Sequence, residues 1–219
     1  MNSIRINRFA RFVPGAFTWA THARVARKIV QVAVPGLFLL LTACGGSMEE
    51  PKIELNPHPA MHYVVTITFD GAPGAFDTIK ASAQYEVTNR DCVPEQPISG
   101  ATILPSKQLW LDLHRVNDGV YETDLYIDQI KDENYFSKGL CRWSLVAVSA
   151  RASHGRMQFV TPLFVPRFFE ERGITNYFSF ASYNEANTAL LNTGNENRAA
   201  YPHPSETFSV QVSAREARR

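Results

Sequence analysis

The chain is 219 residues long and nearly neutral as a whole, with 22 basic and 21 acidic side chains. Six of the basic residues and none of the acidic ones precede Cys44, so the 176 residues from Cys44 onward have 16 basic against 21 acidic residues, a net charge of about −5. This balance argues against nucleic acid as a partner, because nucleic-acid binding depends on clustered Lys and Arg, and the length fits one domain with a sizeable core.

The first 43 residues have the three parts of a secretory signal. Six basic residues come first, residues 29–40 form a short apolar run, and small residues precede Cys44. Pro35 and Gly36 interrupt the apolar run, which is shorter than the roughly 20 apolar residues of a membrane-spanning helix. The sequence therefore predicts export with removal of the signal, and an uncleaved anchor is the alternative. Because the basic region is longer than usual, a true start downstream of Met1 is also open.

Leu41-Thr42-Ala43-Cys44, followed by Gly45-Gly46-Ser47, resembles the lipobox of bacterial lipoproteins. The resemblance implies that residues 1–43 are cleaved off and that Cys44 becomes a lipid-modified N-terminus. In that family an Asp after the Cys retains the protein in the inner membrane, and Gly45 stands there instead. The resemblance therefore implies a lipid anchor in the outer membrane, with the protein on its periplasmic face. The alternative is an ordinary secretory signal cut near the same position.

Two further cysteines, Cys92 and Cys141, remain once Cys44 is assigned to lipid. An even pair of cysteines in an exported chain favours a disulfide, because the periplasm is oxidising. The loop that it closes is about 50 residues long, which corresponds to roughly 4 kcal/mol of stabilisation in the chain-entropy model. The alternatives are two free thiols or a metal pair, although neither a CxxC motif nor a His at ligand spacing favours metal.

After a proline-rich tether over residues 44–60, short apolar runs alternate with turn residues. The clearest element is a hairpin, in which residues 107–116 and 120–127 flank Asn117-Asp118-Gly119, whose residue types accept positive φ. Pro162 places part of another run at a sheet edge or a bulge. Besides the hairpin, we expect strands over residues 62–69, 80–88, 141–150, 157–165 and 208–212.

The remaining segments are less regular, and they predict loops with little helix. Residues 128–139 are polar and acidic and predict a helical turn or a long loop, and residues 183–197 predict a short helix with a loop. About seven or eight strands predict a single all-β domain over residues 61–219 with an irregular C-terminal part. From the positions of the two cysteines, and with Trp110 and Trp143 in strands, we expect an immunoglobulin-like or transthyretin-like antiparallel β-sandwich with one disulfide.

No motif in the sequence indicates catalysis or a cofactor. The chain has no Gly-x-Ser-x-Gly elbow, no phosphate-binding loop and no dinucleotide fingerprint, and its six histidines lie at no metal-ligating spacing. We therefore predict no catalytic residue, no cofactor and no metal. The acids Asp124, Asp128, Asp132 and Glu133 leave two alternatives open: a calcium site, although the EF-hand ligand series is missing, and a carboxylate pair for sugar hydrolysis, which depends on three-dimensional separation.

The most distinctive stretch of the exported part is residues 132–143, around the second of the paired cysteines. Aromatic residues and Arg dominate the hot spots of protein interfaces, and here they lie in a loop that the disulfide is expected to pin. The alternative is structural, with the aromatic side chains plugging the end of the sandwich and Arg142 paired with a nearby acid. The candidates for binding a partner are Asp132, Glu133, Tyr135, Phe136 and Arg142.

The chain resembles small bacterial lipoproteins in architecture and location only. The shared features are a lipobox, a proline-rich tether and one disulfide-pinned β domain without a catalytic motif. These lipoproteins include immunity proteins against the toxins of rival cells. The resemblance implies a non-enzymatic protein-binding module, such as an immunity protein or inhibitor of a secreted toxin, with membrane lipid and a periplasmic protein as its partners. The alternatives are an envelope hydrolase acting on peptidoglycan or glycan through Asp124, Asp128 and Glu133, and an accessory lipoprotein of a secretion or assembly complex.

Overall fold

The computed structural model describes residues 52–217, which fold mainly into strands. The predicted signal, the lipobox and the first part of the tether lie outside the described residues. Among residues 52–217, no helix has the length and apolar character to cross a membrane. The strands are β1 (His62–Asp70), β2 (Thr78–Val87), β3 (Ser106–Leu111), β4 (His114–Asn117), β5 (Val120–Tyr126), β6 (Trp143–His154), β7 (Met157–Phe164), β8 (Ile174–Ser179), β9 (Leu191–Asn192) and β10 (Thr207–Glu216).

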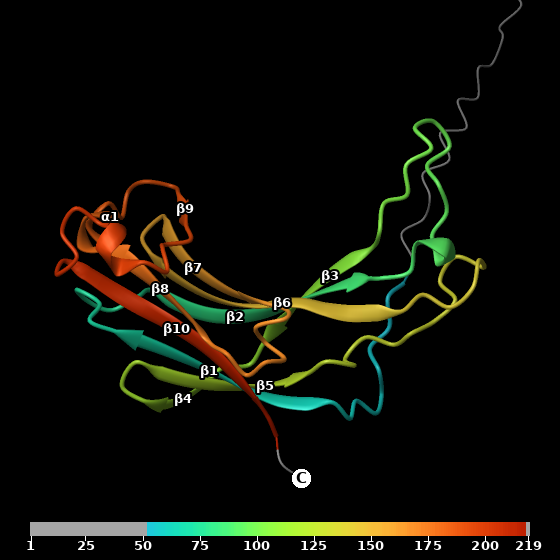
Figure 1. The fold of residues 1–219 in the computed structure, drawn as a ribbon, viewed down its shortest axis with the longest axis horizontal. Helices are drawn as coiled ribbons and strands as arrows, with labels where there is room; N and C mark the ends of the chain where they lie inside the picture. Colours follow the sequence, from blue (N-terminus) through green and yellow to red (C-terminus); the bar gives the residue numbers. More distant parts are fainter. Residues whose placement is uncertain (1–51, 218–219) are drawn as a thin grey trace, which may run out of the picture. The chain divides into compact units, whose positions relative to one another are not determined.

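Two five-stranded sheets stack into the predicted sandwich (Figure 1). The first sheet has the order β4-β5-β1-β10-β8, and the second has the order β3-β2-β6-β7-β9. Neighbouring strands are antiparallel, except that the two-residue β9 runs parallel to β7. In the part of the chain that the structure describes, helix is confined to α1 (Phe180–Asn184) and two 3₁₀ turns (Arg90–Cys92 and Arg198–Ala200). The structure thus confirms the all-β sandwich with one disulfide.

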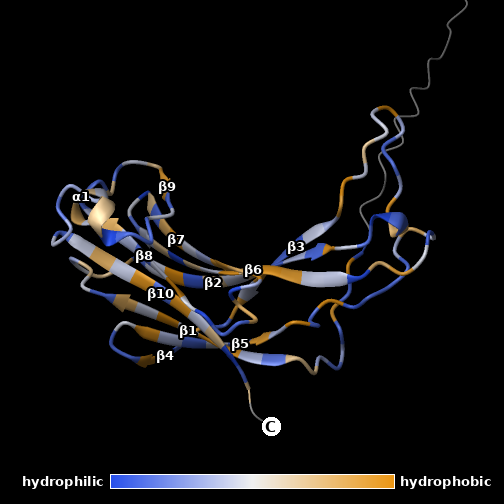
Figure 2. Cartoon of the chain, in the orientation of Figure 1, coloured by the Kyte–Doolittle hydropathy of each residue, from blue (hydrophilic) through white to orange (hydrophobic). Residues whose placement is uncertain are grey.

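The core lies between the two sheets because apolar and polar residues alternate along the strands. Val65 and Ile67 on β1 are fully buried, and so are Ala81, Ala83 and Tyr85 on β2 in the other sheet. Successive side chains of a strand point to opposite faces, so this period of two gives each sheet one apolar face. Figure 2 shows the resulting change between hydrophobic and hydrophilic residues along the strands.

An aromatic cluster fills one end of the sandwich and draws on the C-terminal part of the chain. The rings of Phe159 and Phe208 lie 5.2 Å apart, and those of Phe178 and Phe208 lie 5.3 Å apart. Each such side chain contributes roughly 1.5–3 kcal/mol on burial. The C-terminal part, predicted to be irregular, therefore supplies core side chains through β8 and β10. The cluster consists of Phe76, Phe159, Phe178, Tyr183 and Phe208.

The predicted hairpin exists, but its first strand is split between the two sheets. Residues 114–117 form β4 and pair with β5 in the first sheet, whereas Ser106–Leu111 forms β3 and pairs with β2 in the second sheet. Burial still alternates across the break, since Leu109, Leu111 and Leu113 all pack against the core. The alternation predicts which face is buried, but both sheets face the same core, so it carries no information on sheet membership.

The turn of this hairpin requires glycine. Gly119 has φ of +71°, and a Cβ at this position would lie 2.5 Å from the carbonyl oxygen of Phe69. The backbone nitrogen of Phe69 donates to the Gly119 carbonyl at 2.7 Å. The close approach of β1 to the turn therefore accounts for glycine after Asn117 and Asp118.

The segment predicted as the end of the tether packs against the domain. Ile53 contacts the core, and Leu55 forms an antiparallel bridge with Ile130. The Asp128 carboxylate accepts hydrogen bonds from the backbone nitrogens of Ala60, at 2.9 Å, and Met61, at 3.0 Å. The domain's own contacts thus begin at Ile53, earlier than the predicted boundary at residue 61.

Candidate binding surface

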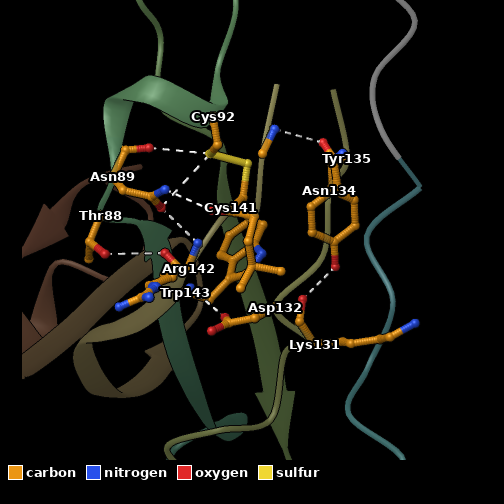
Figure 3. Close-up of a disulfide and its surroundings, with 12 residues drawn as sticks. Thr88, Asn89, Cys92, Lys131, Asp132, Asn134, Tyr135, Cys141, Arg142 and Trp143 are labelled. Atoms are coloured by element: carbon orange, nitrogen blue, oxygen red, sulfur yellow. Dashed lines mark hydrogen bonds between the residues drawn. A yellow bond between two sulfur atoms is a disulfide. The ribbon is translucent and has the colours of Figure 1, made fainter. Parts of the chain in front are cut away.

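The predicted disulfide is present at one end of the second sheet. Cys92 and Cys141 are bonded, with their Cα atoms 5.3 Å apart, and both are buried. Cys92 lies just after β2 and Cys141 just before β6, which are neighbouring strands (Figure 3). The bond therefore ties two loops together beyond the end of one sheet, rather than joining the two sheets.

A small apolar cluster surrounds the disulfide, separate from the main core. Val87 and Val93 are buried beside the two sulfur atoms, and Leu104 packs against them from the loop before β3. Trp143 contacts both this cluster and the main core. The loops at this end thus have an apolar centre of their own, which stabilises them beyond the effect of the covalent bond.

Asn89 fastens the loop after β2 to the segment before β6. Its side-chain nitrogen donates to the Leu140 carbonyl at 2.8 Å, and its side-chain oxygen accepts from the Arg142 backbone nitrogen at 2.7 Å (Figure 3). The Thr88 backbone nitrogen also donates to the Arg142 carbonyl at 2.9 Å. One amide side chain and the disulfide therefore hold the two loops in a fixed relation.

Four of the five predicted binding residues have structural contacts. Tyr135 and Phe136 are half-buried against the disulfide cluster, and the Tyr135 hydroxyl donates to the Lys131 carbonyl at 2.7 Å. Burial raises the pKa of Tyr135. The Asp132 carboxylate accepts from the Trp143 backbone nitrogen at 2.9 Å, and the Glu133 carboxylate lies 3.1 Å from Lys131 Nζ.

Arg142 differs from the other four candidates because its side chain points into solvent. Its backbone is held by Asn89 and Thr88, and its guanidinium forms no ion pair within residues 52–217. The alternative in which Arg142 pairs with a nearby acid is therefore not the arrangement in this structure. A fixed backbone with a free cationic head leaves Arg142 available to an acidic group on another molecule.

The loop between β2 and β3 presents apolar side chains that the sequence analysis did not select. Ile98 is fully exposed, Ile103 is 65% exposed, and Leu140 on the neighbouring loop is 49% exposed. Figure 1 shows the β2–β3 loop projecting past the ends of the strands, and Figure 2 shows hydrophobic residues along it. The available sequence signal was an Ile between Pro97 and Ser99, where strand periodicity does not require an apolar residue.

The tip of this loop is a closed turn. The Gln96 nitrogen donates to the Ala101 carbonyl at 2.8 Å, and the Gly100 nitrogen donates to the Gln96 carbonyl at 2.9 Å. Gly100 has φ of +66°, which glycine adopts without strain. Ile98 is thus displayed at the apex of a hydrogen-bonded turn. We call Ile98, Ile103, Leu140 and Arg142 the disulfide-end surface.

The acidic side chains considered for hydrolysis or calcium binding already have hydrogen-bond or ion-pair partners within the protein. Asp124 lies 2.7 Å from His62 Nε2, Asp128 binds backbone nitrogens, and Glu133 pairs with Lys131. Within the described range, no group of three or more His, Cys, Asp or Glu side chains is arranged to hold a metal ion. No family model, curated protein or solved structure matches this chain.

Proposed function

We propose that this chain is a lipid-anchored, non-enzymatic protein-binding module on the periplasmic face of the bacterial outer membrane, and that it inhibits a secreted toxin. The observation that carries the proposal is the display of Ile98, fully exposed, at the apex of a hydrogen-bonded turn. The partner binds the disulfide-end surface. The lipobox resemblance of this chain supports the proposed location, and the acidic composition after Cys44 argues against nucleic acid as a partner.

The rigidity of the loops supports binding at this end. An exposed apolar side chain gains about 25 cal/mol for each Å² of apolar area that a partner covers. Binding also avoids much of the entropy cost of ordering a loop when that loop is already fixed. The disulfide, the Asn89 hydrogen bonds and the closed turn provide this order in the free protein.

The form of the surface indicates the form of the partner. A narrow turn with an apolar apex fits a concave apolar pocket, such as the active-site cleft of an enzyme. Arg142 is bound through its backbone to Asn89, at the start of the same loop, so an acidic group at the rim of that pocket would complete the contact. A toxin that is an enzyme would be inhibited because its cleft is blocked, and the inhibitor itself would catalyse no reaction.

The test has a cellular and a molecular part. Deleting the gene should sensitise cells to the toxin encoded beside it, and the wild-type gene should restore resistance. Ile98→Asp should weaken binding of that toxin at least about tenfold in calorimetry. Val116→Asp, at an exposed apolar position on β4, is the matched control and should leave binding unchanged. Unchanged sensitivity in the killing assay, or equal binding by Ile98→Asp and wild type, contradicts the proposal.

The hydrolase alternative has a direct test of its own. Asp124, Asp128 and Glu133 are its acids, and each is engaged in the contacts described above. We expect no release of soluble fragments from purified peptidoglycan by the wild-type protein. Fragment release that Asp124→Asn abolishes would establish a hydrolase in place of the inhibitor.

A further inference from the structure

Trp110 is a large aromatic residue on the edge strand β3, and it is 56% exposed. Burying an indole normally contributes strongly to stability, but more than half of this side chain stays exposed and adds nothing to the stability of the fold. Its backbone pairs with Ser82 of β2, which places it on the second sheet far from the disulfide. The disulfide-end surface includes no part of it.

A hollow of about 360 Å³ lies on one side of Trp110, between the edge of β3 and the strand β5 of the other sheet. Leu55, Leu109 and Leu111 give it apolar walls, and Tyr85 and Tyr126 add aromatic ones. The hollow also has polar side chains. Some of them donate and accept hydrogen bonds, and the carboxylates only accept. The polar side chains are Asp112, His114, Thr123, Asp124 and Gln129.

A second hollow of about 350 Å³ also borders Trp110. Both hollows share Trp110, Leu111 and Asp112, and Lys80 and Leu113 also line the second. The two together follow β3 into the crossing toward β4. We call them the Trp110 groove, and two adjoining hollows suit a chain of linked units better than one small molecule.

The charges of the groove select a neutral ligand. Lys80 Nζ lies 5.4 Å from the centre of the Trp110 ring, in the position that a cationic ligand would take. Asp124 is paired with His62 at 2.7 Å, so one of the two carboxylates already has a partner. The carboxylates of Asp112 and Asp124 would repel an anion.

We infer that the Trp110 groove binds a neutral oligosaccharide. A pyranose ring has an apolar face of C–H groups, which stacks on the electron-rich face of an indole. Its hydroxyl groups donate to the Asp112 carboxylate and exchange hydrogen bonds with His114 and Gln129, groups that line the same hollow. Lys80 lies over one face of the Trp110 ring, so one sugar ring stacks on the opposite face and a linked ring lies in the second hollow beside Lys80.

The binding test uses the full-length protein in detergent and three neutral probes. These are the linear tetramers of N-acetylglucosamine, of α-linked glucose and of β-linked glucose. At least one should bind in calorimetry and change the tryptophan fluorescence. Trp110→Ala should weaken that binding at least about tenfold, and Asp112→Ala should also weaken it. Trp110→Phe should retain part of the affinity, because it keeps an aromatic face.

Two controls separate groove binding from misfolding and from other ligands. Phe164→Ala removes an aromatic side chain of similar exposure on β7 and should leave sugar binding unchanged. All variants should keep the melting temperature of the wild type within a few degrees. The inference is overturned if none of the tetramers binds, if Trp110→Ala binds as well as wild type, or if tetramethylammonium binds more tightly than every tetramer. None of these outcomes depends on whether a toxin binds at Ile98.

Discussion

Tyr85 links the two sheets through a buried hydrogen bond. It lies on β2 of the second sheet, and its hydroxyl donates to the Tyr126 carbonyl at the end of β5 in the first sheet, at 2.6 Å. Burial, and secondarily the negative charge of Asp128, strongly raise the pKa of Tyr85 above its ordinary value of 10.0. The folded state therefore holds this proton more tightly than the unfolded state does.

The raised pKa of Tyr85 makes the protein sensitive to alkali. The stabilisation is fully present below about pH 10 and is lost as the pH rises from there toward the folded-state pKa. We expect the free energy of unfolding to fall above pH 10, by up to about 1.4 kcal/mol per pH unit for this group. Tyr85→Phe should cost about 1–2 kcal/mol at pH 7 and flatten the fall above pH 10. Urea unfolding at several pH values measures both the loss of stability at pH 7 and the slope above pH 10.

Tyr121→Phe is the control for this prediction. The Tyr121 hydroxyl makes no side-chain hydrogen bond with any of residues 52–217. Its replacement should change the stability by less than about 0.5 kcal/mol. If Tyr85→Phe leaves the alkaline slope as steep as in the wild type, the assignment of that slope to Tyr85 is wrong.

Asp128 is predicted to serve stability and not catalysis. Its carboxylate binds the backbone nitrogens of Ala60 and Met61, and the Asn56 side chain donates to its carbonyl at 2.9 Å. Asp128→Ala should lower the free energy of unfolding by about 1–3 kcal/mol, because it leaves backbone donors without their partner. Asp118→Ala removes an exposed surface ion pair with Arg115 and should have almost no effect. Equal unfolding midpoints for the two variants would refute this role.

At the scale of elements, the disulfide closes a loop with a sequence separation of 49. Replacing both cysteines by Ala should lower the free energy of unfolding by roughly 4 kcal/mol in the chain-entropy model. The loss should be accompanied by faster amide exchange in residues 131–142, since only non-covalent contacts then hold the two loops. Reduction of the wild type should reproduce both effects, and unchanged exchange after reduction would show that the disulfide does not order these loops.

Strands with a clear alternation could be predicted from sequence, but their partners could not. The expected strand over residues 62–69 corresponds to β1, and the expected 208–212 lies within the longer β10. Pro162 lies where β7 is paired only with β6, as its missing N–H requires. The sequence analysis missed β8, because residues 167–180 are rich in aromatic residues without a regular alternation.

At the candidate site, the disulfide could be predicted from the number of cysteines. The exposed residues of the disulfide-end surface could not be predicted from any sequence pattern. Tyr135 and Phe136 were predicted as binding residues, but both are partly buried against the disulfide cluster, and composition cannot separate a structural plug from a binding hot spot. Trp110 was assigned to a strand correctly. Its exposure depends on the position of β3 at the sheet edge, which only the pairing of the strands determines.

At the scale of the whole molecule, the lipid anchor that we propose would decide where the proposed binding surfaces act. Cys44→Ala should move the protein from the membrane fraction to the soluble periplasmic fraction, since no lipid can then be attached. The same variant should keep the unfolding midpoint of the domain, because the domain's contacts begin at Ile53. Fractionation and urea unfolding measure the two parts. A Cys44→Ala protein that stays with the membrane contradicts lipid anchoring.

The first and last strands of the domain lie side by side in the middle of one sheet. β1 pairs with β10 from Tyr63 opposite Glu216 to Asp70 opposite Ser209, and β10 also pairs with β8. The first sheet therefore cannot close until the last of its strands has left the ribosome. A chain that cannot finish folding during its synthesis remains unfolded, and passage through a secretion channel requires an unfolded chain. In the export that we propose, this order of strands would keep the first sheet open until the chain reaches the compartment in which Cys92 and Cys141 oxidise.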